Sequence, residues 1–309
     1  MNYKIKGIFF TTVGSACWGF SGSVGQYLFQ VQNMDSRWLV PIRLGLAGII
    51  LLIYCFFKNG KETLKPWSTK ALAITTLIYG ILGISACQFF YFLTIQLSNA
   101  ALGTILQDLA PLFILIYTCI VKHHKPRKIE IISIILAICG MFLLTSHGDV
   151  STLYASLPAL IAGVISGLCV MVYNILAPRL EGIPVTIIQG WSFLLGSIVI
   201  GLVFKSWSIH YVPNIYGVLG ILFVTFVGNI IAFTMYISGV QIIGPQKASL
   251  YSFAEPITAA IISSTVLGSV FNIYDIIGFL MIFAMMYLIT FTGKESQCKI
   301  KNKNYPLDC

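Results

Sequence analysis

The sequence predicts an all-α integral membrane protein with ten transmembrane helices, arranged as two inverted five-helix repeats. Three observations predict this fold class. The composition is strongly apolar, apolar segments of membrane-spanning length recur along nearly the whole chain, and one pattern of residues occurs twice at an offset of 145 residues.

Composition sets the class of protein. Hydrophobic residues make up 57% of the chain and charged residues 9%, and the mean hydropathy is +0.89. A soluble domain has roughly a quarter of its residues charged. An apolar helix of about 20 residues crosses the ~30 Å hydrocarbon core of a bilayer. The lipid bilayer is therefore the expected surroundings of most of this chain.

Ten apolar segments are predicted to cross the membrane, separated by short connections that carry turn residues. In the first half of the chain they cover residues 7–29, 38–57, 71–97, 100–121 and 130–146. In the second half they cover residues 157–177, 185–204, 215–239, 248–267 and 275–291. No connection is long enough for an extramembrane domain.

An internal repeat relates the two halves. Identical residues fall at one offset in four places: Gly83 and Gly228, Tyr91 and Tyr236, Gln96 and Gln241, Pro111 and Pro256. The repeating unit holds five spans, an odd number, so the second copy enters the membrane upside down relative to the first. The predicted domains are residues 1–148 and 149–292, one repeat each, followed by a polar basic tail over residues 293–309.

The distribution of lysine and arginine predicts the orientation. When alternate connections are grouped, sixteen basic residues lie on one side and two, Arg37 and Lys205, on the other, while Arg43 lies inside a span. Cytoplasmic loops carry the excess of positive charge. The sequence thus predicts a multi-pass protein of the plasma membrane with both termini cytoplasmic. The net charge of +9 is explained by topology, which argues against nucleic-acid binding.

Three charged residues lie inside predicted spans away from their first residue: Arg43, Asp108 and Glu255. Such groups are costly at membrane depth and by default mark a pathway or a coupling site. The two acids each shortly precede a repeat-matched proline, Pro111 or Pro256, where a helix kink is predicted. Simpler interpretations remain open. Arg43 could extend to the membrane surface or pair with one of the acids, and Glu255 could lie near a vestibule.

Polar and aromatic residues inside the spans are the candidates for binding a substrate. The first, third, fourth, sixth, eighth and ninth spans carry small or polar stripes and are predicted to surround a cavity. The candidate substrate-binding residues are Trp18, Gly22, Gln88, Tyr91, Gln107, Tyr173, Asn174, Asn229 and Tyr251. Small residues at helical spacing also serve as packing surfaces between membrane helices, and aromatic residues also pack or anchor at the interface.

No metal site and no cofactor is predicted. The pair His123-His124 stands among lysines and is interpreted as part of a basic loop. The eight cysteines show no metal-ligand spacing and are interpreted as buried packing residues or tail residues. Motifs of an intramembrane enzyme, such as His-Glu-x-x-His or Gly-x-Ser-x-Gly, are missing from the sequence.

The chain resembles the EamA-type transporters of the drug/metabolite transporter superfamily. The resemblance rests on residues 16–19 (ACWG), 41–44 (PIRL), 110–113 (APLF) with Gly140, and 254–257 (AEPI) with Gly278. It implies ten helices in an inverted five-plus-five repeat around a central substrate cavity.

The resemblance also implies a secondary transporter of amino acids or similar small metabolites, working by alternating access as an exporter or a proton-coupled carrier. The alternatives are a multidrug or organic-cation carrier, a sugar carrier and, less favoured, a channel or an intramembrane enzyme. Proton coupling and a homodimer are left open.

Overall fold

The computed structural model describes residues 3–121, 127–146, 150–244, 248 and 251–304, and every regular element in these ranges is a helix. Residues 147–149, on which the predicted boundary between the repeats falls, lie outside the described residues, as do His123 and His124.

The described residues of the first half form seven α-helices, one 3₁₀-helix and one π-helix. These are α1 (Tyr3–Gln30), α2 (Ser36–Asn59), the 3₁₀-helix η1 (Gly60–Trp67), α3 (Lys70–Ile78), the π-helix η2 (Tyr79–Ser85), α4 (Ala86–Leu97), α5 (Ala100–Gln107), α6 (Ala110–Val121) and α7 (Lys128–Ser146).

The second half follows the same order. It contains α8 (Val150–Leu176), the 3₁₀-helix η3 (Ala177–Leu180), α9 (Val185–Phe204), the 3₁₀-helix η4 (Ser206–Ser208), α10 (Ile215–Phe223), the π-helix η5 (Val224–Ile231), α11 (Ala232–Ile243), α13 (Ala254–Thr265) and α14 (Ile273–Asn304).

Six of these segments are long and apolar enough to cross a membrane, which confirms the prediction of a multi-pass helical protein. They are Ser36–Trp67, Lys70–Leu97, Ala100–Val121, Leu157–Leu180, Val185–Phe204 and Ile215–Ile243, and Ile273–Leu288 is a shorter apolar helix. Segments 7–29 and 130–146 are also helical. The number of ten spans stays a prediction.

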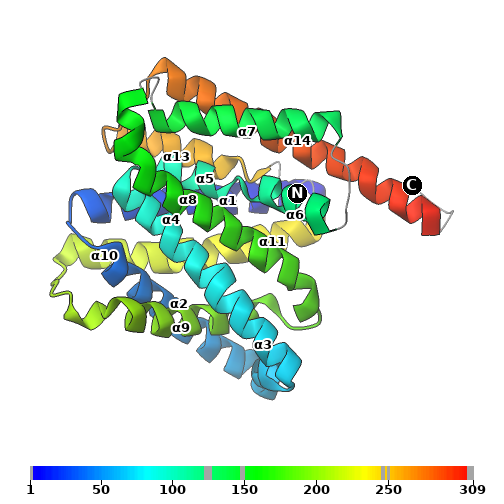
Figure 1. Ribbon diagram of the computed structural model, residues 1–309. Helices are drawn as coiled ribbons and strands as arrows, with labels where there is room; N and C mark the ends of the chain where they lie inside the picture. Colours follow the sequence, from blue (N-terminus) through cyan, green and yellow to red (C-terminus); the bar gives the residue numbers. More distant parts are fainter. Residues whose placement is uncertain (1–2, 122–126, 147–149, 245–247, 249–250, 305–309) are drawn as a thin grey trace.

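Helices of one half pack against helices of the other half, so the two halves do not form two separate bundles (Figure 1). α2 lies beside α9, and α7 lies beside α14. α1 packs on α11 and α13 of the second half, and α8 packs on α4 and α5 of the first half. At the crossing of α7 and α14, a Cβ added to Gly140 would lie 3.0 Å from the carbonyl oxygen of Gly278. Such close approach is typical of small residues between membrane helices.

The helices that close each half begin in the same way. The Glu130 carboxylate accepts a hydrogen bond from the Arg127 backbone N–H at 2.7 Å. The Asp275 carboxylate accepts one from the Asn272 backbone N–H at 2.8 Å. Both pairs are 145 residues apart, and in each an acid in the first turn satisfies a backbone donor that the helix leaves free. The matched sequences around residues 130 and 275 therefore encode the same helix start.

A π-helical segment interrupts the same span in each half. η2 and η5 begin 145 residues apart, and each contains one of the repeat-matched glycines, Gly83 or Gly228. Gly83 faces Tyr173 of α8, and Gly228 faces Ser21 of α1. Each π-helix thus packs on the first helix of the opposite half. Single π-helical turns within longer helices are often found at functional sites.

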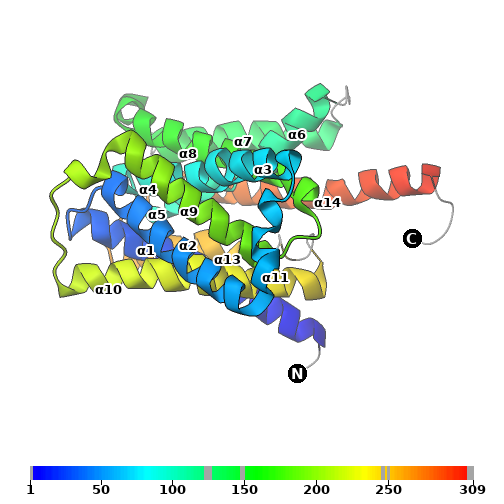
Figure 2. The ribbon, with the colours of Figure 1, turned by 90° about the horizontal axis from the view of Figure 1, so that it is seen from below.

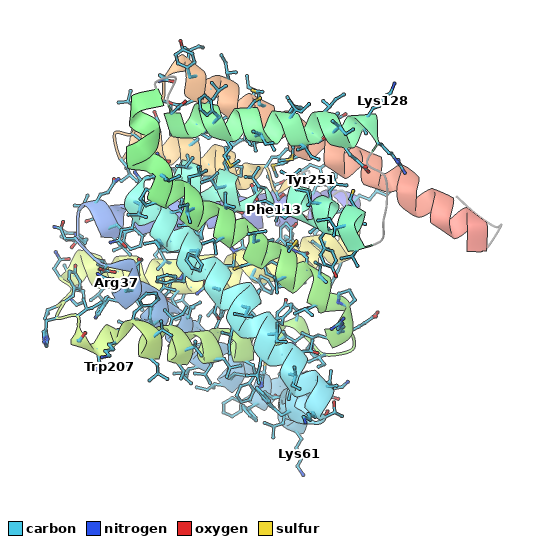
Figure 3. All side chains as sticks on the ribbon, viewed as in Figure 1. Arg37, Lys61, Phe113, Lys128, Trp207 and Tyr251 are labelled. Carbon is cyan, nitrogen blue, oxygen red and sulfur yellow. The ribbon has the colours of Figure 1, made fainter. Side chains whose placement is uncertain are left out.

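Figure 2 shows the bundle from below. Charged loop residues lie at both ends of the bundle. Figure 3 places Arg37 and Trp207 at one end and Lys61 and Lys128 toward the other. α1 begins and α14 ends on the side of Lys128 (Figure 1). Up to Asn304, the segment predicted as a polar basic tail is the continuation of helix α14.

Candidate functional site

A cavity of about 490 Å³ lies between the two halves of the molecule. It receives side chains from α1, α2, η2, α4, α5, α6, α8, α9, η5, α11, α13 and α14. Its lining includes Ile114 of α6, Ala177 of η3 and Val185, the first residue of α9. A volume of this size suits a small organic molecule.

Two interrupted helices contribute backbone and acidic groups to the cavity. The fourth span breaks between α5 and α6 at residues 108–109, just before Pro111. In the second half, α13 begins at Ala254, two residues before Pro256, after a turn at residues 252–253. Each proline lies in the first turn of its helix, where its missing N–H costs no helical hydrogen bond. The interruptions lie within one residue of the repeat offset.

Arg43 of α2 carries a buried positive charge at the cavity wall, with 2% of its surface exposed. Its Nη2 donates to Gln88 Oε1 of α4 at 3.1 Å and also to the side-chain oxygen of Asn229 in η5. The guanidinium carbon lies 3.9 Å from the centre of the Phe92 ring, which is a cation–π contact. The expectation that Arg43 could extend to the membrane surface is wrong, because its side chain is held in the interior.

The two acids line the same cavity without an ionic partner. Among the described residues, no carboxylate lies within 4.0 Å of the Arg43 guanidinium, so it forms no salt bridge with Asp108 or Glu255. One carboxylate oxygen of Asp108, Oδ2, is buried without a hydrogen-bond partner. Glu255 is 7% exposed, and its side chain makes no hydrogen bond to any described residue. The suggested pairing of Arg43 with an acid is replaced by pairing with two neutral amides.

Other predicted polar residues hold the walls together. Gln107 Oε1 accepts hydrogen bonds from Ser166 Oγ at 3.1 Å and from Cys87 Sγ at 3.5 Å, which joins α5, α8 and α4. Asn174 also lines the cavity, and its Nδ2 donates to the Val170 carbonyl one turn earlier in α8 at 2.8 Å.

Aromatic side chains cover much of the remaining wall. Trp18, Tyr91, Tyr173 and Tyr236 all line the cavity. Trp18 Nε1 donates to the Gly228 carbonyl of η5 at 2.9 Å, and its ring centre lies 5.0 Å from that of Tyr236. The Tyr91 hydroxyl is buried and has no hydrogen-bond partner among the described residues.

Three predicted residues lie outside the cavity wall. Gly22 faces the Tyr91 hydroxyl, so it makes room for that ring. Pro256 is buried in the first turn of α13. Tyr251, labelled in Figure 3, lies between α11 and α13 and is partly exposed. The structure also adds Gln189 of α9, a buried lining residue whose amide oxygen accepts no hydrogen bond from any described residue. A glutamine inside an apolar span was the signal that could have identified it.

The end of the bundle away from Ile114 is closed by a hydrogen-bond cluster on Gln26 of α1, which is 0% exposed. Its Oε1 accepts from the Ala100 backbone N–H of α5 and from Ser263 Oγ of α13, both at 2.9 Å. Its Nε2 donates to Gln30 and to Ser269, both at 3.1 Å. All four hydrogen-bonding positions of this amide are used.

Metal-ligating residues do not gather in the part of the chain that the structure describes, where no three His, Cys, Asp or Glu side chains could hold an ion together.

Known proteins resemble this chain over nearly its full length. The model of the EamA-like transporter family matches residues 5–146 and again residues 154–291. The chain is 30% identical over 291 residues to the uncharacterized inner membrane transporter YicL of Salmonella typhimurium, covering 94% of this chain and 97% of that protein. It is 25% identical over 243 residues to the uncharacterized transporter YyaM of Bacillus subtilis, covering 76% and 78%.

A solved crystal structure has the same fold, with a TM-score of 0.62 over 95% of this chain and 99% of that chain at 15% identity. That likeness concerns the fold alone, whereas the double family match and the 30% identity to a transporter confirm the resemblance drawn from the sequence. The chain belongs to the EamA-like transporter family and is a multi-pass membrane transporter.

Proposed function

We propose that this transporter is a secondary carrier that moves amino acids or similar small metabolites across the plasma membrane by alternating access. The observation that carries the proposal is the cavity between the two halves, closed by the Gln26 cluster at one end and lined out to Ile114 and Val185 toward the other. A carrier needs such a site, reached from one side at a time.

The pairing of equivalent helices supports an inverted five-plus-five plan of ten spans. α2 packs on α9 and α7 on α14, as expected when a pseudo-two-fold axis in the membrane plane relates two repeats. With the orientation predicted from the basic loops, the cavity faces the cytoplasm. The structure then corresponds to the inward-facing state of the carrier.

Charge and polarity support an amino-acid-like substrate. One arginine and two acids line one cavity without pairing with one another. A substrate that carries both an ammonium and a carboxylate could satisfy both kinds of group. Glu255 is our candidate for proton coupling, because its buried carboxylate has no hydrogen-bond or ionic partner in the described part of the chain and lies beside a helix interruption.

An organic cation is the second candidate substrate. Two acids stand against one arginine, and the aromatic rings of Trp18, Tyr173 and Tyr236 could stack on a cation. The two candidates differ in one respect, because only an amino acid needs an anion-binding group in the wall.

Counterflow in proteoliposomes tests the carrier proposal. Vesicles preloaded with a mixture of unlabelled amino acids should take up a labelled amino acid, added outside at trace concentration, faster than empty vesicles do. A channel would show flux that preloading does not accelerate, and this outcome would overturn the carrier mechanism. Preloading with organic cations in a parallel arm tests the second candidate.

A further inference from the structure

The guanidinium of Arg43 has no counter-charge beside it in the cavity wall. It is 2% exposed, and no carboxylate of the described residues comes within 4.0 Å of it. Arginine keeps its positive charge in proteins. A buried charge without a counter-charge is costly and is found where a partner arrives during function. Its environment therefore favours an incoming anion.

Two amides fix the guanidinium without using it up. Gln88 and Asn229 both accept from Nη2, while Nε and Nη1 are buried and have no hydrogen-bond partner among the residues that the structure describes. The ring of Phe92 covers one face of the group. If Arg43 served only to link α2, α4 and η5, its Nη2 group alone would be sufficient. Its Nε and Nη1 donors have no role in that link.

Other unpaired donors come from the same part of the wall. The hydroxyl of Tyr91 and Nδ2 of Asn229 are both buried without hydrogen-bond partners among the described residues. Arg43, Tyr91 and Asn229 all line the cavity. Unpaired groups on the interrupted helices are acceptors instead, namely Asp108 Oδ2 and the Glu255 carboxylate. These unpaired donors and the unpaired carboxylates therefore come from different helices of the lining, and Gln189 Oε1 of α9 is a further unpaired acceptor among the described residues.

We propose that Arg43, Tyr91 and Asn229, with Gln88 as the positioning residue, form an oxyanion subsite for the carboxylate of the transported molecule. The planar N–H groups of a guanidinium match a carboxylate, and the subsite would leave the acids of α5 and α13 to the ammonium end. The inference rests on the proposed carrier function and specifies which wall holds which end of the substrate.

The subsite joins residues from both halves of the chain. Arg43 and Gln88 belong to the first half of the chain, and Asn229 belongs to η5 of the second. A carboxylate bound there would contact both halves. Its affinity would therefore differ between two arrangements of the repeats, which is the condition for a ligand to shift a conformational equilibrium.

A matched ligand series tests the subsite on the purified full-length protein in lipid nanodiscs. Each amino acid, its carboxamide, its decarboxylated amine and its deaminated acid are compared by thermal shift and equilibrium binding. We expect the amino acid to bind and the amide and amine to bind roughly tenfold more weakly or worse, since charged hydrogen bonds are lost. Amines that bind as well as the amino acids, or no binding by any carboxylate, would overturn the subsite.

Two variants and one control test whether the preference for a carboxylate depends on Arg43. Arg43→Gln should abolish the preference for the amino acid over its amide. Asn229→Asp changes no cavity shape but supplies a fixed counter-charge to Arg43, so it should weaken amino-acid binding roughly tenfold or more while the protein stays folded. Arg37→Gln, on the exposed start of α2 where Arg37 pairs with Asp35, should leave binding unchanged. Full carboxylate preference in folded Asn229→Asp protein would contradict the assignment.

The test of the carboxylate subsite and the test of the carrier function can fail independently of each other. Counterflow of organic cations without any carboxylate binding would retain the carrier and reject the subsite. Carboxylate binding at Arg43 without counterflow would retain the subsite and reject the carrier.

Discussion

The Gln26 side chain of α1 accepts a hydrogen bond from the backbone N–H of Ala100, the first residue of α5, at 2.9 Å. This bond joins the first and fourth spans at the end of the bundle opposite to Ile114 and Val185. Gln30 adds a weaker contact there, donating to the Ser98 carbonyl at 3.4 Å. The bond to Ser263 links Gln26 to α13. Opening this end requires α1 and α13 to leave α4 and α5.

Loss of this amide should open the closed end. Gln26→Leu leaves the Ala100 N–H and Ser263 Oγ without their acceptor, so we expect the free energy of unfolding to fall by about 1–3 kcal/mol. The outward-facing state should become more populated. In a variant that keeps Cys87 of the cavity wall as its single cysteine, an impermeant thiol reagent added outside should react faster.

Gln30→Leu is the comparison. The exposed amide of Gln30 donates to the Ser98 carbonyl at 3.4 Å and accepts from Gln26 Nε2 at 3.1 Å, so its loss keeps the acceptor of Ala100 and Ser263 in place and should change access less. Unchanged labelling of Cys87 in the Gln26→Leu variant would show that this cluster does not control access.

The glycine of the first π-helix should not tolerate a side chain. A Cβ at Gly83 would lie 2.7 Å from the Cβ of Tyr173 and 3.3 Å from its backbone. We expect Gly83→Ala to cost about 1–3 kcal/mol through overpacking and to reduce transport. Thermal unfolding in detergent measures the first effect, and counterflow measures the second.

Gly201→Ala is the comparison for that experiment. Its Cβ would find Pro41 at 3.9 Å and no closer atom, so the change should be neutral or should stabilise helix α9 by up to about 1 kcal/mol. Equal effects of the two substitutions would contradict the packing role of Gly83.

The two acids should separate coupling from binding. If Glu255 carries the proton, Glu255→Gln should abolish accumulation driven by a pH gradient but retain counterflow, since exchange needs no net proton movement. Asp108→Asn, which removes the other acid of the wall, should weaken both processes if Asp108 holds the substrate ammonium. Gradient-driven accumulation by the double variant at the normal rate would exclude both roles.

Orientation can be tested at two exposed loop positions. Glu62 lies in η1, and Val212, 92% exposed, lies in the loop before α10. The basic-loop count predicts that the first is cytoplasmic and the second external. An impermeant thiol reagent applied to intact cells should label Val212→Cys and miss Glu62→Cys. The reverse labelling would invert the orientation of both repeats.

The sequence could predict the features that depend on composition and repetition. Apolar segments identify spans because lipid requires a helical backbone with its hydrogen bonds satisfied internally. The offset of Pro111 and Pro256 predicted where two helices would be interrupted. Ionisable residues inside spans led directly to the cavity, since Arg43, Asp108 and Glu255 have few other places to lie.

The hydrogen-bond partners of the buried polar side chains could not be predicted in the same way. Arg43 contacts Gln88 and Asn229 because α2, α4 and η5 meet there, and no sequence pattern records that meeting. The π-helices leave no compositional signal beyond Gly83 and Gly228. Gln26 lies in the first span, one of those whose small or polar stripes were predicted to surround the cavity. Its side chain lies at the closed end instead, since a stripe identifies a face of a helix and not a depth along it.

Alternating access requires a change in the distance between the C-terminal ends of α1 and α4, and this distance tests the account most directly. Spin labels at Val31→Cys and Leu97→Cys, both on exposed positions, report this distance by double electron–electron resonance in a transport-active variant without other cysteines. The account predicts a short distance, matching the closed structure, and a second, longer one. Gln26→Leu should increase the longer population, and a transported substrate should change the ratio. A single unchanging distance in protein that still carries out counterflow would contradict the account.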